Sequence, residues 1–337
     1  GGDIVMLTSG DYYGPCDIIA SEPLIGGEVT IIESLDPQIP AVFHNGGGDY
    51  ILSVAGPVVT LMLMAFTDVP AGTSAIELQS GSEMSVRFNA FYDMDGDALV
   101  TTGSVASALV NDNTFTDLGG TAMSLGCADG SCVLAGADVH ENLIIGAGYG
   151  IVFGPGSWGV VEDNNLAAIS GVGIGLAAGA SEATIVEQNF VESVGDALLV
   201  SGSAQVHSNI AIGSGSLVAV SSPDQWIRGN TLIGGLSLDG WGNESGQQFT
   251  NNAVAAAIPT TGAVAITGGN VDCRELATCF YDAEAWDFYP VPGSDLRTEG
   301  RELGEPLLSD WCGRGRGVPQ TVGALEAASV LSFGAVE

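Results

Sequence analysis

Acidic and basic side chains recur at one position of a phrase that repeats along the chain. Glu187, His207 and Arg228 each follow an aliphatic residue, and each precedes an asparagine by two positions. A carboxylate, an imidazole and a guanidinium in one sugar-binding groove could exchange protons with a substrate. The alternative is a ladder of complementary charges on a solvated face, where each pair contributes a few tenths of a kcal/mol. The sequence favours the ladder, and these three residues are the catalytic candidates if the protein is an enzyme.

A second candidate group consists only of carboxylates. The segment DMDGD places Asp93, Asp95 and Asp97 at alternating positions. Carboxylates spaced in this way suit a hard cation such as calcium. Ser104 stands where an EF-hand loop would carry its bidentate glutamate, so the segment is not an EF-hand. A calcium site and a solvated acidic turn both remain open, and the sequence favours the turn. His44 has no partner in the sequence around it and is interpreted as a loop residue.

The six cysteines fall into two close pairs and two single residues. Cys127 and Cys132 bracket one short loop, and Cys273 and Cys279 bracket another, which predicts two local disulfides. The spacing does not suit zinc. The partners of Cys16 and Cys312 stay open. Disulfides predict an oxidising location, either extracellular, at the cell surface or periplasmic.

The charge of the chain excludes several classes of partner. All 7 basic residues are arginine, and 40 Asp and Glu give a net charge of −33 over 337 residues. Such a surface repels nucleic acids and anionic lipids. The sequence also contains no apolar run long enough to span a bilayer.

The repeated phrase indicates the elements that carry these side chains. An aliphatic residue, two variable residues and Asn recur every 20 to 29 residues, and the asparagines are Asn89, Asn113, Asn142, Asn164, Asn189, Asn209, Asn230 and Asn252. We expect Asn at a sharp bend, because it tolerates the left-handed backbone region, and we expect its amides to stack along the molecule. The residues that follow the aliphatic position form a polar column: Arg87, Asn111, His140, Glu162, Glu187, His207, Arg228 and Thr250.

A second phrase of alternating apolar residues follows each asparagine by about 8 to 12 residues and predicts a second strand. Two short strands per repeat with no room for a helix predict an all-β parallel solenoid of roughly 10 to 12 coils over residues 1–285. Residues 286–337 are expected to form an irregular tail that packs on the solenoid or extends from it. Within it, AASVLSFGAVE (327–337) is interpreted as a spare strand.

The two phrases together resemble the right-handed parallel β-helix repeat of pectate-lyase-like proteins over about residues 50–270. The opening GDIVMLTSGDYYG (2–14) is similar to the first coil of many such proteins, and WDFYPVPGSDL (286–296) with VPQTVGALE (318–326) resembles the tail of bacterial secreted members. The resemblance implies the fold, which serves lyases, hydrolases, adhesins and passive scaffolds alike.

In the lyases of this family, the resemblance implies a site on the outward side of one sheet, with acidic calcium ligands and a basic residue. The corresponding column here is mostly small or apolar: Glu77, Val100, Ser124, Val152, Gly175, Leu199, Val218, Ser237 and Ala265. This apolar stripe offers no base for proton abstraction. It needs a cover, and we expect the C-terminal tail to supply it.

The sequence therefore favours a secreted or cell-surface β-helix without catalytic activity, which serves in extracellular assembly or adhesion and associates with itself or with other surface components. The alternative is a polysaccharide-active lyase or hydrolase of acidic glycans, or a passive carbohydrate-binding protein that uses Trp158, Trp226 and Trp241.

Overall fold

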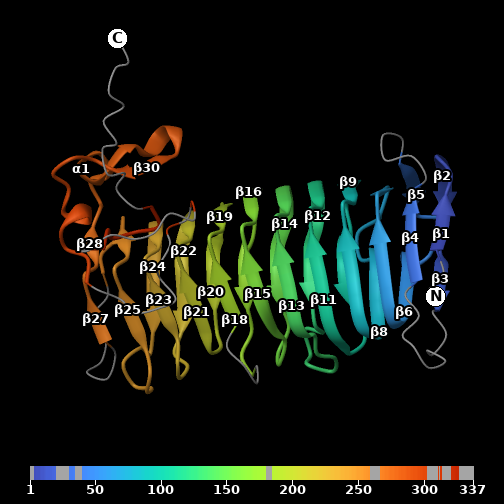
Figure 1. The fold of residues 1–337 in the computed structure, drawn as a ribbon, viewed down its shortest axis with the longest axis horizontal. Coiled ribbons are helices and arrows are strands. Elements are labelled where there is room, and N and C mark those ends of the chain that lie inside the picture. The colour runs from blue at the N-terminus through green and yellow to red at the C-terminus, as the bar shows by residue number, and fades with distance from the viewer. Residues whose placement is uncertain are drawn as a thin grey trace, which may run out of the picture.

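The chain winds into a single rod of parallel coils, seen in the computed structural model as a row of arrows side by side (Figure 1). The structure describes residues 4–19, 30–34, 40–179, 184–258, 266–301, 310, 312 and 320–325. The strands lie along three parallel faces of the rod, here named sheets A, B and C in chain order, and most described coils contribute one strand to each. Within the described part, no helix is long and apolar enough to cross a membrane. The spare strand predicted at 327–337 lies outside these residues.

Sheet A holds the strands that precede the asparagine bend. Its members are β1 (Ile4–Leu7), β4 (Thr30–Ser34), the ends of β6 (Tyr50–Met62) and β8 (Ser74–Arg87), β11 (Val105–Asn111), β13 (Ala135–His140), β15 (Trp158–Glu162), β18 (Thr184–Glu187), β21 (Ala204–His207), β23 (Trp226–Arg228), β25 (Gln248–Thr250) and β27 (Ile266–Gly268).

Sheet B holds the strands that follow the bend. Its members are β2 (Gly10–Tyr13), β5 (Ala41–His44), β7 (Met64–Thr67), β9 (Ala90–Met94), the starts of β12 (Thr114–Leu125) and β14 (Leu143–Phe153), β16 (Asn165–Ile169), β19 (Phe190–Ser193), the starts of β22 (Ile210–Val220) and β24 (Thr231–Asp239), β26 (Ala253–Val254) and β28 (Val271–Asp272).

Sheet C holds the strands of the second phrase. Its members are β3 (Cys16–Ile19), the starts of β6 and β8, β10 (Asp97–Thr101), the ends of β12 and β14, β17 (Ile174–Leu176), β20 (Asp196–Val200) and the ends of β22 and β24. The sequence predicted two strands in each repeat, and the structure has three because the residues just after each asparagine also pair.

Apolar side chains fill the interior of the rod in columns. One column in sheet B stacks Tyr12, Phe43, Phe66, Phe91 and Phe115, with ring centroids 5.2, 5.2, 5.0 and 4.7 Å apart. Strand spacing in a sheet is close to the distance at which aromatic rings stack, so one aromatic in each coil continues the column. Burial of these rings provides the main driving force for coiling at this end of the rod.

The predicted asparagine ladder is confirmed along its whole length and continues to Asn270. Each side-chain amide donates to the Oδ1 of the next asparagine at 3.0 to 3.1 Å. The same Oδ1 accepts the main-chain N–H of the preceding asparagine. Nine coils from Asn89 to Asn270 therefore share one buried chain of hydrogen bonds, which satisfies the backbone at the bend.

The expected reason for asparagine at the bend is wrong. The left-handed residue is the one before it, at φ between 52° and 61° along the series Phe88, Asp112, Glu141, Asp163, Gln188, Ser208, Gly229 and Asn251. The left-handed backbone conformation therefore falls on the position before the asparagine, where the residue type differs from coil to coil. Asparagine is required because its amide must both donate and accept inside the rod.

The C-terminal segment packs on the outer face of sheet B. Its elements are α1 (Leu276–Cys279), β29 (Phe280–Asp282), the 3₁₀ turn η1 (Ala283–Ala285), β30 (Asp287–Pro290) and the 3₁₀ turn η2 (Asp295–Arg297). They form a second apolar core with outward residues of sheet B, comprising Phe190, Ile210, Ala253, Val271, Cys273, Cys279, Phe280, Phe288, Leu296, Val322, Ala324 and Leu325. The described tail residues therefore cover sheet B, and the cover expected on the apolar stripe of sheet C stays a prediction.

Both predicted disulfides are present, Cys127–Cys132 and Cys273–Cys279. The second closes the loop that carries α1 onto the last coil. Cys16 and Cys312 are free and exposed.

Candidate acid/base site

The polar column predicted from the sequence lies on the outer face of sheet A in continuous register. Neighbouring members pair strand by strand from Arg87 through Asn111, His140, Glu162, Glu187, His207 and Arg228 to Thr250. Parallel neighbours lie about 4.8 Å apart. The fold thus brings together acid and base groups that are 20 or more residues apart in sequence.

Glu187 and His207 form the centre of this column. Oε2 of Glu187 lies 3.3 Å from Nδ1 of His207, and 26% of the Glu187 side chain but only 6% of the His207 side chain is exposed. Burial raises the pKa of Glu187, and the charges of Glu162 and Asp163 raise it further. The carboxyl therefore retains its proton to a higher pH than a free glutamate does.

Glu162 provides a second carboxyl one strand away from Glu187. It is half-buried, and burial together with Asp163 and Asp138 raises its pKa, while the neighbouring His140 lowers it. The main chain that holds both acids is fixed from inside the rod. The Glu162 carbonyl accepts from Asn164 Nδ2 at 2.9 Å, and the Glu187 carbonyl accepts from Asn189 Nδ2 at 2.8 Å.

Arg228 lies next to His207 in the column, but its guanidinium is directed elsewhere. It is 7% exposed, donates from Nη2 to Gln248 Oε1 at 2.6 Å, and lies 4.2 Å from the centre of the Trp226 ring. Desolvation lowers the pKa of Arg228. The structure therefore brings Glu187 and His207 together and places Arg228 in a separate contact with Gln248 and Trp226.

Comparison with known proteins supports the architecture. The family model described as the right handed beta helix region matches residues 64–254, which is more than half of the chain. This chain belongs to the right-handed β-helix family. No curated protein sequence matches it.

Two solved structures resemble this β-helix at 15% identity. A mutant of the PL6 family alginate lyase AlyGC aligns with 80% of this chain and 44% of its own, at a TM-score of 0.56. The pectate lyase Pel9A aligns with 96% of this chain and 88% of its own, at a TM-score of 0.48. The chain thus spans less than half of the alginate lyase. The likeness to the alginate lyase supports the fold.

The outward column of sheet C has the predicted register, from Glu77 through Val100, Ser124, Val152, Gly175, Leu199 and Val218 to Ser237. Ala265 lies outside the described residues. Most of these side chains are half-buried, and the only ionisable one is Glu77. Apart from Glu77, the described stripe therefore lacks acid/base groups like those of the column on sheet A.

The three aspartates proposed for calcium have separate surroundings. Asp93 occupies the left-handed region at φ 52°, in line with Asp68 and Asp117 of the adjacent coils. Oδ1 of Asp97 accepts a hydrogen bond from the Thr121 main chain at 2.6 Å. Among the described residues, no three His, Cys, Asp or Glu side chains are grouped to hold a metal ion. The segment joins β9 to β10, and the calcium site on Asp93, Asp95 and Asp97 stays a prediction.

His44 was interpreted as a loop residue, and that interpretation is wrong. It ends β5, where Nδ1 lies 2.6 Å from Asp68 Oδ2 and Nε2 lies 3.3 Å from Asp11 Oδ1. The hydrogen bond with Asp68 raises the pKa of His44, and Asp11 adds to this effect. Asp11 and Asp68 belong to the coils on either side of His44 and lie 33 and 24 residues from it in sequence. Only the coil period could have predicted these two partners.

The three tryptophans proposed for sugar binding differ in exposure. Trp241 is 3% exposed and belongs to the core, so it cannot bind a sugar. Trp158 and Trp226 are half-buried on sheet A. Trp226 donates from Nε1 to the Gly246 carbonyl at 3.0 Å, which fixes its ring beside Arg228.

Proposed function

We propose that this β-helix is a polysaccharide-active protein and that its reaction is hydrolysis of a glycosidic bond on the outer face of sheet A. The proposal rests on Glu187, whose half-buried carboxyl lies 3.3 Å from the buried His207 and in register with Glu162. Hydrolysis of a glycoside requires two carboxyl groups, one of which must be protonated to assist the leaving group. The raised pKa of Glu187 suits it to be that general acid.

Glu162 is the candidate for the second carboxyl group. Its strand pairs in register with that of Glu187, and neighbouring parallel strands lie about 4.8 Å apart. Retaining glycosidases hold their carboxyl groups about 5 to 5.5 Å apart, whereas inverting enzymes need a wider gap for water. We therefore assign Glu162 as the partner carboxyl of Glu187, and the anomer first released in the assay distinguishes retention from inversion.

The charge balance favours a neutral glycan. The net charge is −33, and the acidic side chains of Asp138, Glu141 and Asp163 lie near Glu162. The neighbouring Arg228 contacts Gln248 and Trp226. β-Elimination on a uronate would need a free base and a positive charge beside the substrate carboxylate. An acidic glycan is therefore a less suitable substrate for this site than a neutral one.

The test is release of reducing ends from a panel of neutral and uronate polysaccharides, with ultraviolet absorbance to detect unsaturated lyase products. We expect reducing ends from a neutral polymer and no unsaturated products. Glu187→Gln should lower kcat by about 10² to 10⁴, the usual contribution of a general acid. Glu83→Gln is the matched control, because Glu83 is an exposed acid of the same sheet. Equal activity of the two variants would refute the assignment.

We also propose assembly as an alternative role, because the outward column of sheet C is apolar from Val100 to Val218 without a described cover. Light scattering after size-exclusion chromatography tests it: oligomers support the role, and a monomer at high concentration refutes it. Either role fits an extracellular, cell-surface or periplasmic protein, in which the two disulfides would be stable.

A further inference from the structure

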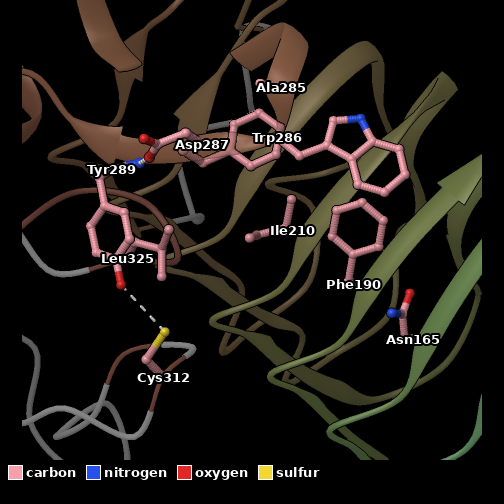
Figure 2. A pocket seen from close by; sticks show the side chains of 10 residues that line it. Asn165, Phe190, Ile210, Ala285, Trp286, Asp287, Tyr289, Cys312 and Leu325 are labelled. Carbon is pink, nitrogen blue, oxygen red and sulfur yellow. Dashed lines mark hydrogen bonds between the residues drawn. The ribbon is translucent and has the colours of Figure 1, made fainter. Parts of the chain in front are cut away.

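A pocket of about 410 Å³ lies between the outer face of sheet B and the C-terminal segment. Its floor is formed by Phe190 of β19 and Ile210 of β22 (Figure 2). Its wall is formed by Trp286, which directly precedes β30, and by Tyr289 of β30. The volume falls within the range of about 300 to 1,000 Å³ that is typical of small-molecule sites. This pocket is on the opposite side of the asparagine bend from the acid/base column, so it is a separate site.

Trp286 is an exposed aromatic residue in the wall of the pocket. Its ring lies over Phe190 with centroids 4.8 Å apart, yet half of the residue is exposed (Figure 2). Its backbone lies in the left-handed region at φ 63°, following a 3₁₀ turn that Asp282 caps through the Ala285 N–H at 3.1 Å. A bulky residue in that region is strained, and such strain concentrates where a side chain must be presented to a ligand.

The pocket is lined by few polar groups, and they are suited to hydroxyl groups. Asn165 contributes an amide, Asp287 an exposed carboxylate and Tyr289 a phenol, and Cys312 Sγ lies 3.6 Å from that phenol oxygen. An amide donates and accepts, and a carboxylate accepts from hydroxyls. An aromatic ring that is exposed on one side offers a flat apolar surface with a polar rim.

We propose that this pocket binds a neutral oligosaccharide, with the C–H face of one sugar ring against Trp286 and hydroxyls of the oligosaccharide at the polar groups Asn165 and Asp287. The class of ligand follows from the proposed function, but the site does not depend on the acid/base column. Asp287 and the net charge of −33 act against a uronate here. The pocket would hold the polysaccharide to the rod while another part of it reaches sheet A.

The test is isothermal titration calorimetry of the full chain with cellotetraose, xylotetraose, mannotetraose and maltotetraose, and with tetragalacturonate as the anionic comparison. We expect binding of at least one neutral tetrasaccharide and weaker binding of the uronate. Trp286→Ala should weaken the neutral interaction by about tenfold, the loss expected for a stacked aromatic. Tyr281→Ala is the matched control, because Tyr281 is an exposed aromatic of β29 that does not line the pocket.

The outcomes separate this site from the proposed catalytic one. Glu187→Gln should bind the tetrasaccharide as the unsubstituted chain does, whether or not hydrolysis is found. The proposal is overturned if no neutral tetrasaccharide binds, if the uronate binds more tightly, or if Trp286→Ala and Tyr281→Ala bind equally. Should Trp286→Ala fail to fold, Asn165→Ala alters an exposed side chain of the same pocket, and unchanged affinity in that variant would overturn the proposal as well.

Discussion

Replacement of Asn164 by alanine should unfold the rod much more readily than replacement of its neighbour Asn165. The Asn164 side chain is 1% exposed and donates to the carbonyls of Val139 and Glu162 at 2.8 and 2.9 Å. Its Oδ1 accepts both the main-chain N–H and the side-chain amide of Asn142, at 3.1 and 3.0 Å. Alanine removes these four contacts and also the ladder hydrogen bond from Asn164 Nδ2 to Asn189 Oδ1 at 3.0 Å.

The size of the effect depends on the buried polar groups that lose their hydrogen-bond partner. A buried polar group without a partner costs about 1 to 3 kcal/mol. The main-chain N–H of Asn142 is the group most affected, because it loses Asn164 Oδ1 and an unpaired buried N–H is tolerated less well than a carbonyl. The side-chain amide of Asn142 keeps its hydrogen bonds to the carbonyls of Val110 and His140. We therefore expect Asn164→Ala to lower the free energy of unfolding by roughly 3 to 5 kcal/mol.

The assay is urea denaturation followed by circular dichroism and tryptophan fluorescence. Asn165→Ala is the control, since this asparagine is adjacent in sequence, exposed, and outside the ladder; it should change the free energy by less than about 0.5 kcal/mol. Asn164→Asp keeps the acceptor and loses the donor, so it should fall between the two. If Asn164→Ala and Asn165→Ala unfold at the same urea concentration, the asparagine ladder does not stabilise the fold.

Two further predictions concern pH. Because the pKa of His44 is raised in the folded chain, its stabilising effect is complete below about pH 6.5, the unfolded value, and is lost as the pH rises through the folded pKa. His44→Gln should therefore lower the melting temperature at pH 5.5 and have little effect at pH 9; an equal loss at both would contradict a charged imidazole. The pKa of Glu187 is also raised, so its ionised form destabilises the fold as the pH rises above about 4.3. Glu187→Gln should raise the melting temperature at pH 8 and have a smaller effect at pH 4, and the opposite trend would show that the carboxylate is stabilised in the fold.

Repetition in the sequence determined the coil, the ladder and the register of both outward columns. A parallel solenoid pairs equivalent positions of successive repeats, so the phrase around Asn189 and Asn209 is sufficient to place Glu187 beside His207. The same argument placed the apolar stripe of sheet C. These features depend on the period alone, which is why one sequence was enough to predict them.

Features without a period required the tertiary structure. The face that the tail covers depends on how an irregular segment fits the outward side chains Phe190 and Ile210, and no repeat encodes that fit. The same packing formed the pocket at Trp286. The two partners of His44 lie in the first coils, where the asparagine phrase is absent. The direction of a side chain could not be predicted from the sequence either. Arg228 lies in the predicted column, but its guanidinium contacts Gln248 and Trp226 instead of Glu187.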